Sequence, residues 1–144
     1  MINLVPGVQS TTAALTAERT RLDIIAQNVA NANTTRGLDG KPYQRQEVVF
    51  DTLLNQQTQG QSTGNAQLSG PRVSRVIKDT RPFRAQYEPG HPEADRNGVV
   101  QYPNVNVYEE MADLIAAGRT FEANLAVLRT AKQMTQQTFS IGKR

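Results

Sequence analysis

Helical spacing of apolar residues at both ends of the chain is the feature that most restricts its fold. Near the N-terminus apolar residues recur seven apart, with one more between the last two: Val8, Leu15, Leu22, Ile25 and Val29. This spacing predicts a helix from about residue 8 to 33 with a narrow apolar stripe. Such a stripe is typical of a helix that pairs with another helix, since a broad core needs a wider apolar face.

A second long helix is predicted after Pro103, because apolar residues there alternate spacings of three and four: Met111, Leu114, Phe121, Leu125 and Leu128. Asn104 and Asn106 are both suited to cap its start. Gly118 lies in its interior, where glycine costs roughly 1 kcal/mol relative to alanine. We therefore expect a neighbouring helix to approach closely at Gly118.

The middle of the chain predicts short strands separated by turns. Strand candidates are the segments 43–50, 71–79, 82–89 and 97–103, with turns at the Asp39-Gly40 and Asn97-Gly98 pairs. Residues from about 52 to 70 are rich in Gln, Gly, Ser and Thr, which predicts a flexible linker. The predicted class is α+β, with a helix in 1–36, a β-rich insertion in 37–103 and a helix in 104–144.

Composition limits the size of the core and the possible locations. Only 38% of the 144 residues are hydrophobic, so we expect the apolar stripes to be buried partly against partners. The absence of cysteine excludes disulfides and thiol chemistry. We identify no Sec-type signal peptide and no membrane-spanning segment, so a protein that leaves the cytoplasm needs another export route.

The chain offers little catalytic equipment, and we predict no catalytic, cofactor-binding or metal site. His91 is the single histidine and has no second His or Cys ligand to join it. Glu109, Glu110 and Asp113 are explained as acids that stabilise the helix dipole.

A basic run in the insertion comprises Arg72, Arg75, Lys78, Arg81 and Arg84. Its spacing of three does not place all of these cations on one strand face, where the period is two. It also lacks interleaved aromatic residues beyond Phe83. We therefore do not expect nucleic-acid binding.

Two terminal motifs resemble those of the bacterial flagellar axial proteins, the rod, hook and hook-junction subunits. They are "LDIIAQNVANANTT" (22–35) and "NGVVQYPNVNVYEEMADLIAAGRTFEANLAVLRTAKQM" (97–134). The segments "GLDGKPYQRQEVVF" (37–50) and "YEPGHPEADRNG" (87–98) are similar to the short insertion of a proximal rod subunit. The chain departs from the family at Gly118, where Ala or Ser is usual, and at Phe121, where Tyr is usual.

The resemblance implies a structural subunit without catalytic activity. The terminal helices would pair as a coiled-coil-like (D0-type) core and pack with other subunits into the innermost tube of a rod that crosses the periplasm and transmits torque. Implied partners are the chain itself, other proximal and distal rod proteins, the membrane-ring and export-gate base, and the flagellar type III export apparatus. The alternative is another helical axial subunit, a secretion-needle-like subunit or an adaptor.

The predicted subunit-interface residues combine both stripes with the amides near the end of the first helix: Leu15, Leu22, Ile25, Asn28, Val29, Asn31, Asn33, Met111, Leu114, Phe121, Asn124, Leu125 and Leu128. Asn28 and Asn31 are three apart on one helix face, where we expect them to bond across a subunit boundary and set register. Asn33 suits the left-handed conformation that ends a helix. The simpler alternative is that these amides only cap the helix end.

Overall fold

The structure, a computed structural model, describes residues 5–37, 39–52 and 70–142, and the predicted linker lies almost entirely outside them. The elements in order are α1 (Val5–Ala30), β1 (Gln46–Thr52), β2 (Pro71–Lys78), β3 (Arg84–Tyr87), β4 (Val99–Tyr102) and α2 (Val107–Ile141). The predicted α+β class is confirmed, with two long helices around a small β insertion. Each predicted strand segment overlaps one strand, and β1 continues to Thr52, past the predicted end at residue 50.

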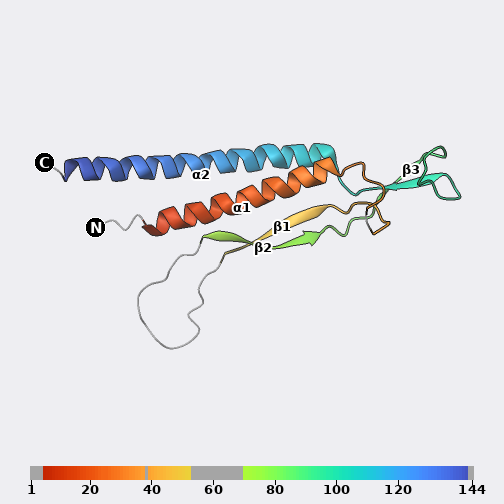
Figure 1. Cartoon of the computed structure of the whole chain (residues 1–144), viewed down its shortest axis with the longest axis horizontal. Coiled ribbons are helices and arrows are strands. Elements are labelled where there is room, and N and C mark those ends of the chain that lie inside the picture. The colour runs from red at the N-terminus through yellow and green to blue at the C-terminus, as the bar shows by residue number, and fades with distance from the viewer. Residues whose placement is uncertain (1–4, 38, 53–69, 143–144) are drawn as a thin grey trace, which may run out of the picture.

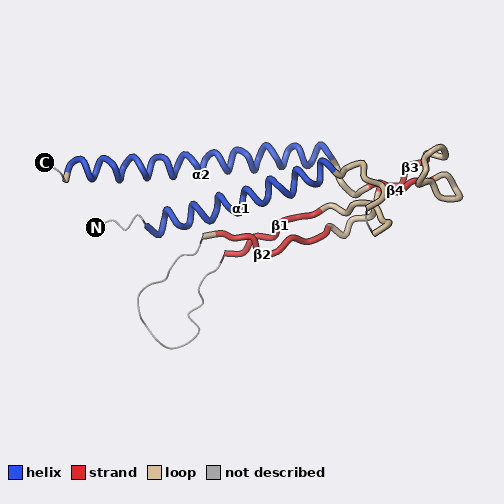
Figure 2. Tube along the Cα trace, in the orientation of Figure 1, coloured by secondary structure: helices blue, strands red, loops and turns tan. Residues whose placement is uncertain are grey.

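The two helices lie side by side and antiparallel, and α1 is the middle layer of the molecule (Figure 1). One side of α1 packs on α2 and another on the hairpin of β1 and β2. The second pair, β3 and β4, lies beyond the end where α1 finishes and α2 begins (Figure 2). With 35 residues, α2 is about 52 Å long against about 39 Å for α1, so its last turns run past the start of α1.

Local chemistry sets the helix boundaries. At the start of α2, the Asn106 side-chain oxygen accepts from the backbone N–H of Tyr108 at 3.1 Å, as predicted for this cap. The first helix begins at Val5, earlier than the predicted residue 8, with Pro6 in its first turn, where the missing backbone N–H costs nothing. It ends at Ala30 instead of residue 33.

The hairpin of β1 and β2 is held against the first half of α1 by a backbone approach. The strands pair antiparallel with Gln46 opposite Lys78, and a bulge shifts the register between Val49 and Phe50. A Cβ atom added to Gly70, just before β2, would lie 2.6 Å from the backbone oxygen of Ser10 on α1. Any side chain at position 70 would therefore push the hairpin away from the helix.

The interior is small and partly polar. Its buried apolar residues are Ala17, Ile25, Ala32, Val100, Val105 and Ala117. Among the described residues two polar side chains are buried: Asn28, which is 1% exposed, and Glu110, which is 0% exposed. Glu110 is also the largest of the fully buried side chains. A buried carboxylate among so few apolar residues needs specific partners.

Gly118 does not have the role expected of it within the chain. A Cβ atom added there would meet no described atom within 4 Å, apart from the helix backbone around it. No helix of the described chain therefore makes the close approach expected at Gly118.

Three glycines provide a graded test of backbone strain in the insertion. Gly98 has φ +73°, and its added Cβ would lie 2.9 Å from the Tyr87 ring. Gly40 has φ +70° but open space, and Gly90 has neither constraint. We expect Gly98→Ala to lower the free energy of unfolding by about 2–3 kcal/mol and Gly40→Ala by about 1 kcal/mol. Gly90→Ala should change it by less than about 0.5 kcal/mol in denaturant unfolding. Equal losses at positions 98 and 90 would contradict the strained turn.

Candidate functional site: a polar hub between the helices and the insertion

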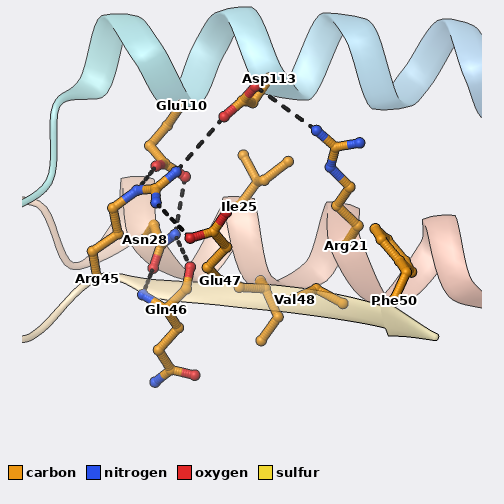
Figure 3. A pocket seen from close by; sticks show the side chains of 11 residues that line it. Arg21, Ile25, Asn28, Arg45, Gln46, Glu47, Val48, Phe50, Glu110 and Asp113 are labelled. Carbon is orange, nitrogen blue, oxygen red and sulfur yellow. Dashed lines mark hydrogen bonds and ion pairs between the residues drawn. The ribbon is translucent and has the colours of Figure 1, made fainter. Parts of the chain in front are cut away.

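A network of side chains, here called the polar hub, joins the end of α1, the start of β1, the end of β2 and the start of α2. Its members are Asn28, Tyr43, Arg45, Asp79, Asn104 and Glu110. Figure 3 shows Arg45, Asn28 and Glu110 meeting between the two helices and β1.

Asn28 uses its whole amide group inside the chain. Its nitrogen donates to the backbone oxygen of Gln46 at 2.8 Å and to Glu110 Oε2 at 3.0 Å. Its oxygen accepts from the Tyr43 hydroxyl at 2.9 Å and from the backbone N–H of Gln46 at 3.0 Å. The amide thus has both donors and both acceptor positions occupied. It fastens α1 to the edge of β1.

Arg45 neutralises the buried carboxylate of α2. Its Nε donates to Glu110 Oε1 at 2.6 Å, and the Arg45 side chain is only 13% exposed. The same guanidinium lies 3.5 Å from Asp79, 3.7 Å from Glu47 and 3.7 Å from Asp113. One guanidinium therefore pairs with four carboxylates from three parts of the chain.

Asn104 and Asp79 complete the hub on the insertion side. The Asn104 oxygen accepts from the backbone N–H of Arg45 at 2.8 Å, and its nitrogen donates to the backbone oxygens of Asp79 and Arg81. Asp79 accepts from the backbone N–H and the Nε of Arg81 at 2.9 and 2.7 Å. Arg81 in turn reaches Glu109 on α2 at 3.4 Å.

Proton affinities in the hub follow from burial and pairing. Burial lowers the pKa of Arg45, but the hydrogen bond to Glu110 and the charge of that carboxylate outweigh it, so the pKa is raised overall. Burial raises the pKa of Asp79, but hydrogen bonds from Arg81 outweigh it and hold the pKa below the ordinary 3.8. Burial, with the Glu110 charge, raises the pKa of the Tyr43 hydroxyl, which keeps the proton it donates to Asn28.

The hub consists of hydrogen bonds and ion pairs that hold segments of the chain together. An open cleft of about 280 Å³ beside it has apolar walls from Ile24, Ile25, Val48 and Phe50 next to the ion pairs. No group of three His, Cys, Asp or Glu side chains suited to a metal ion occurs in residues 5–37, 39–52 and 70–142. His91 lies away from the hub, where its Nδ1 accepts from the backbone N–H of Glu93 at 3.1 Å.

The hub corrects the predicted role of Asn28 and gives Asn31 partners within the chain. Asn28 was expected to bond to a neighbouring subunit, but the chain itself saturates its amide. Asn31 bonds at the end of its own helix: its nitrogen donates to the Gln27 backbone oxygen at 2.9 Å, and its oxygen accepts from Thr34. Asn33 is exposed. The amides of residues 28 and 31 therefore act within the chain.

The dipole explanation of the acids at the start of α2 is incomplete. Glu109 and Glu110 both lie in the first turn, as expected, but Glu110 is buried in the hub. Sequence reasoning also missed Arg45, which bonds to Glu110, and Tyr43, which bonds to Asn28. A detectable signal was the polar Asn28 three residues after Ile25, on the helix face that the structure buries.

The structure sorts the other predicted interface residues by exposure. Ile25 is buried in the monomer. Seven more are half-buried: Leu15, Leu22, Val29, Phe121, Asn124, Leu125 and Leu128. Met111 and Leu114 are exposed at 51% and 40%. Part of the predicted subunit interface is therefore covered by the chain itself.

Two segments of the chain match families of flagellar rod proteins. Residues 9–36 match the family described as "Flagella basal body rod protein". Residues 96–141 match "Flagellar basal body rod FlgEFG protein C-terminal". These segments hold most of α1 and all of α2, so the two terminal helices are those of flagellar rod proteins.

Three relatives that align with nearly the whole chain show which rod protein family it belongs to. The chain is 36% identical to the flagellar basal-body rod protein FlgC of Borreliella burgdorferi, over 97% of this chain and 98% of the relative. It is 41% identical to FlgC of Salmonella typhimurium, over 91% and 92%, and 38% identical to FlgC of Bacillus subtilis, over 91% and 93%. The chain belongs to the FlgC family of flagellar basal-body rod proteins, which are structural rod subunits. Neither described helix is long and apolar enough to cross a membrane.

Removing the Asn28 amide should destabilise the fold. Asn28→Ala leaves the Tyr43 hydroxyl, the Gln46 backbone and one Glu110 oxygen without partners, and each unsatisfied buried group costs about 1–3 kcal/mol. We expect the free energy of unfolding to fall by about 3 kcal/mol in denaturant titration of the purified chain. Asn33→Ala, at an exposed amide, is the control and should change it by less than about 0.5 kcal/mol. Equal stability of the two variants would contradict the hub.

Acid should weaken the hub through Asp79. Because its folded pKa is below the ordinary 3.8, its charge stabilises the fold above that pH, and the contribution is lost as pH falls through the folded pKa. Asp79→Asn should therefore be less stable than the natural chain at pH 6, with the gap closing below pH 3.8. Unfolding free energies between pH 7 and 2 measure this. A constant gap across the range would show that Asp79 stabilises by something other than its charge.

Proposed function

We propose that this rod subunit assembles through the outward faces of its terminal helices. The observation that carries the proposal is the exposure of large apolar side chains on α2, between 40% and 85%: Tyr108, Met111, Leu114, Ile115, Val127, Met134, Phe139 and Ile141. Apolar exposure this extensive marks an interaction surface. Burial of each side chain in an interface contributes roughly 1.5–3 kcal/mol.

The predicted interface residues then divide into two groups. Met111 and Leu114 face outward and contact a neighbouring subunit. The buried and half-buried residues hold the helix pair together, and their partly exposed edges border the intersubunit contact: Leu15, Leu22, Ile25, Val29, Phe121, Asn124, Leu125 and Leu128. Intact pairing of α1 and α2 is thus a condition for assembly.

Membership of the family supports the finer features of the proposal. The subunit reaches the rod through the flagellar type III export apparatus and becomes part of the periplasm-spanning shaft that transmits motor torque. Its neighbours are further copies of itself, other proximal and distal rod proteins, and the membrane-ring and export-gate base. It carries out no catalysis and binds neither cofactor nor nucleic acid.

A charge at the free end of α2 should block assembly without unfolding the subunit. Phe139 is 71% exposed, so Phe139→Arg should leave the unfolding free energy within about 0.5 kcal/mol. We expect loss of swimming, and loss of the subunit from purified basal bodies. Gln101→Arg, at an exposed position on β4, is the matched control and should behave like the natural chain. Normal swimming with Phe139→Arg would overturn the interface at this end.

A further inference from the structure

The two outer edges of the hairpin of β1 and β2 differ. The outer edge of β1 faces α1, where the backbone N–H and C=O of Gln46 bond to the Asn28 side chain. The outer edge of β2 is open, because no strand in residues 5–37, 39–52 and 70–142 pairs with it. Figure 1 shows β2 on the side of the hairpin farther from α2. A strand edge with unpaired backbone groups can bind an extended segment as an additional strand.

The backbone groups that an additional strand would bond belong to Val76 and Lys78. Just after β2, the backbone N–H of Asp79 donates to the Arg45 oxygen at 2.8 Å, so Asp79 faces β1. Bonding alternates along an antiparallel pair, so the N–H and C=O of Lys78 and Val76 point away from β1. Val76 and Ile77 are 43% and 38% exposed, and an edge strand with exposed apolar side chains is prone to pair.

Three cations of β2 lack an acid to pair with. Arg72, Arg75 and Lys78 are exposed, and none of them forms an ion pair within the part of the chain that the structure describes. Residues 53–69, which connect the two strands, contain neither Asp nor Glu. Carboxylates that pair with these cations would therefore come from another molecule.

The order of side chains on β2 defines the sequence that fits beside it. Residues 75–78 read cation, apolar, apolar, cation: Arg75, Val76, Ile77 and Lys78. Side chains directly opposite each other on neighbouring strands share a face, where opposite charges attract and β-branched residues pack together. The complementary segment therefore reads acid, apolar, apolar, acid. This pattern is the same in both chain directions.

A second copy of this chain does not offer such a segment among its described strands. Pairing β2 with β2 in this register would place cations beside cations, which is destabilising. In β1 three apolar residues separate the acids Glu47 and Asp51, and the outer edge of this strand is already bonded to Asn28. The strands β3 and β4 contain no acid.

We propose that β2 binds, as a third strand of the hairpin, an extended segment of a different protein whose side chains read acid, apolar, apolar, acid. The backbone groups of Val76 and Lys78 form the new ladder, and the charges of Arg75 and Lys78 set its register. This contact lies on the insertion, so it is separate from the helix faces through which the subunit is proposed to assemble.

Peptide binding to the purified full-length chain tests the pairing. A labelled peptide Thr-Glu-Val-Val-Glu-Thr is compared with Thr-Val-Glu-Glu-Val-Thr, which has the same composition and charge in another order. We expect the first peptide to bind at least tenfold more tightly in fluorescence anisotropy and to slow amide hydrogen exchange at Val76 and Lys78. No binding, equal affinities, or binding without protection of these amides would each overturn the proposal.

Two variants separate backbone pairing from charge. Val76→Pro removes an outward N–H, which an edge strand tolerates, so the chain should keep its circular dichroism but lose the peptide. Val76→Thr keeps the N–H and the β-branched shape, and should bind as the natural chain does. The double variant Arg75→Glu, Lys78→Glu should lose the acidic peptide and bind Thr-Lys-Val-Val-Lys-Thr instead. Should Val76→Pro unfold, this charge reversal decides alone, and unchanged peptide preference would refute the proposal.

Photo-cross-linking identifies the source of the segment in the assembled structure. The variant Ile77→p-benzoylphenylalanine is irradiated in purified basal bodies, and the cross-linked peptides are sequenced by mass spectrometry. We expect an adduct with a different protein, at a segment that carries the acid, apolar, apolar, acid pattern. An adduct between two copies of this chain, or with a segment that lacks the pattern, would show that another contact covers β2.

Discussion

The ion pair between Glu110 and Arg45 is the contact on which the rest of the structure depends. A carboxylate with no exposed surface is tolerated only when it is paired and hydrogen-bonded, because desolvating it costs several kcal/mol. The residue before β1 must therefore lie against the first turn of α2. Asn28, bonded to the same carboxylate, must come from the end of α1. One buried charge thus fixes three segments that are far apart in the sequence.

A second attachment makes the insertion and the helix pair one unit. The hub holds the hairpin of β1 and β2 near the end of α1, and the close approach of Gly70 to Ser10 holds it near the beginning. Fully satisfied polar networks specify one arrangement more strictly than apolar packing does, since any slip leaves a buried group unpaired. The insertion cannot shift along the helix pair without breaking one of these two attachments.

Features whose cause lies within a few neighbouring residues could be predicted from the sequence. The cap at Asn106, the glycine turns at residues 40 and 98, and the four strands all follow from local chemistry. The hub could not be found in this way, because Arg45 and Glu110 are separated by 65 positions. Glu110 also had a sufficient local explanation as an acid in the first helical turn. A local explanation that is true can therefore hide a long-range role.

The spacing of apolar residues on α2 predicts less about their neighbours than about the helix itself. Alternation of three and four shows that a helix face will be covered, but it does not say whether the cover comes from the same chain or another. In the structure, α1 covers the side with Leu125 and Leu128 and leaves Met111 and Leu114 open. A helix in a polymer packs against its own chain on one side and against another chain on a second side. The apolar residues for these two contacts therefore overlap in the sequence of α2. Gly118 marks the boundary, because it is half-buried yet faces space that this chain does not fill.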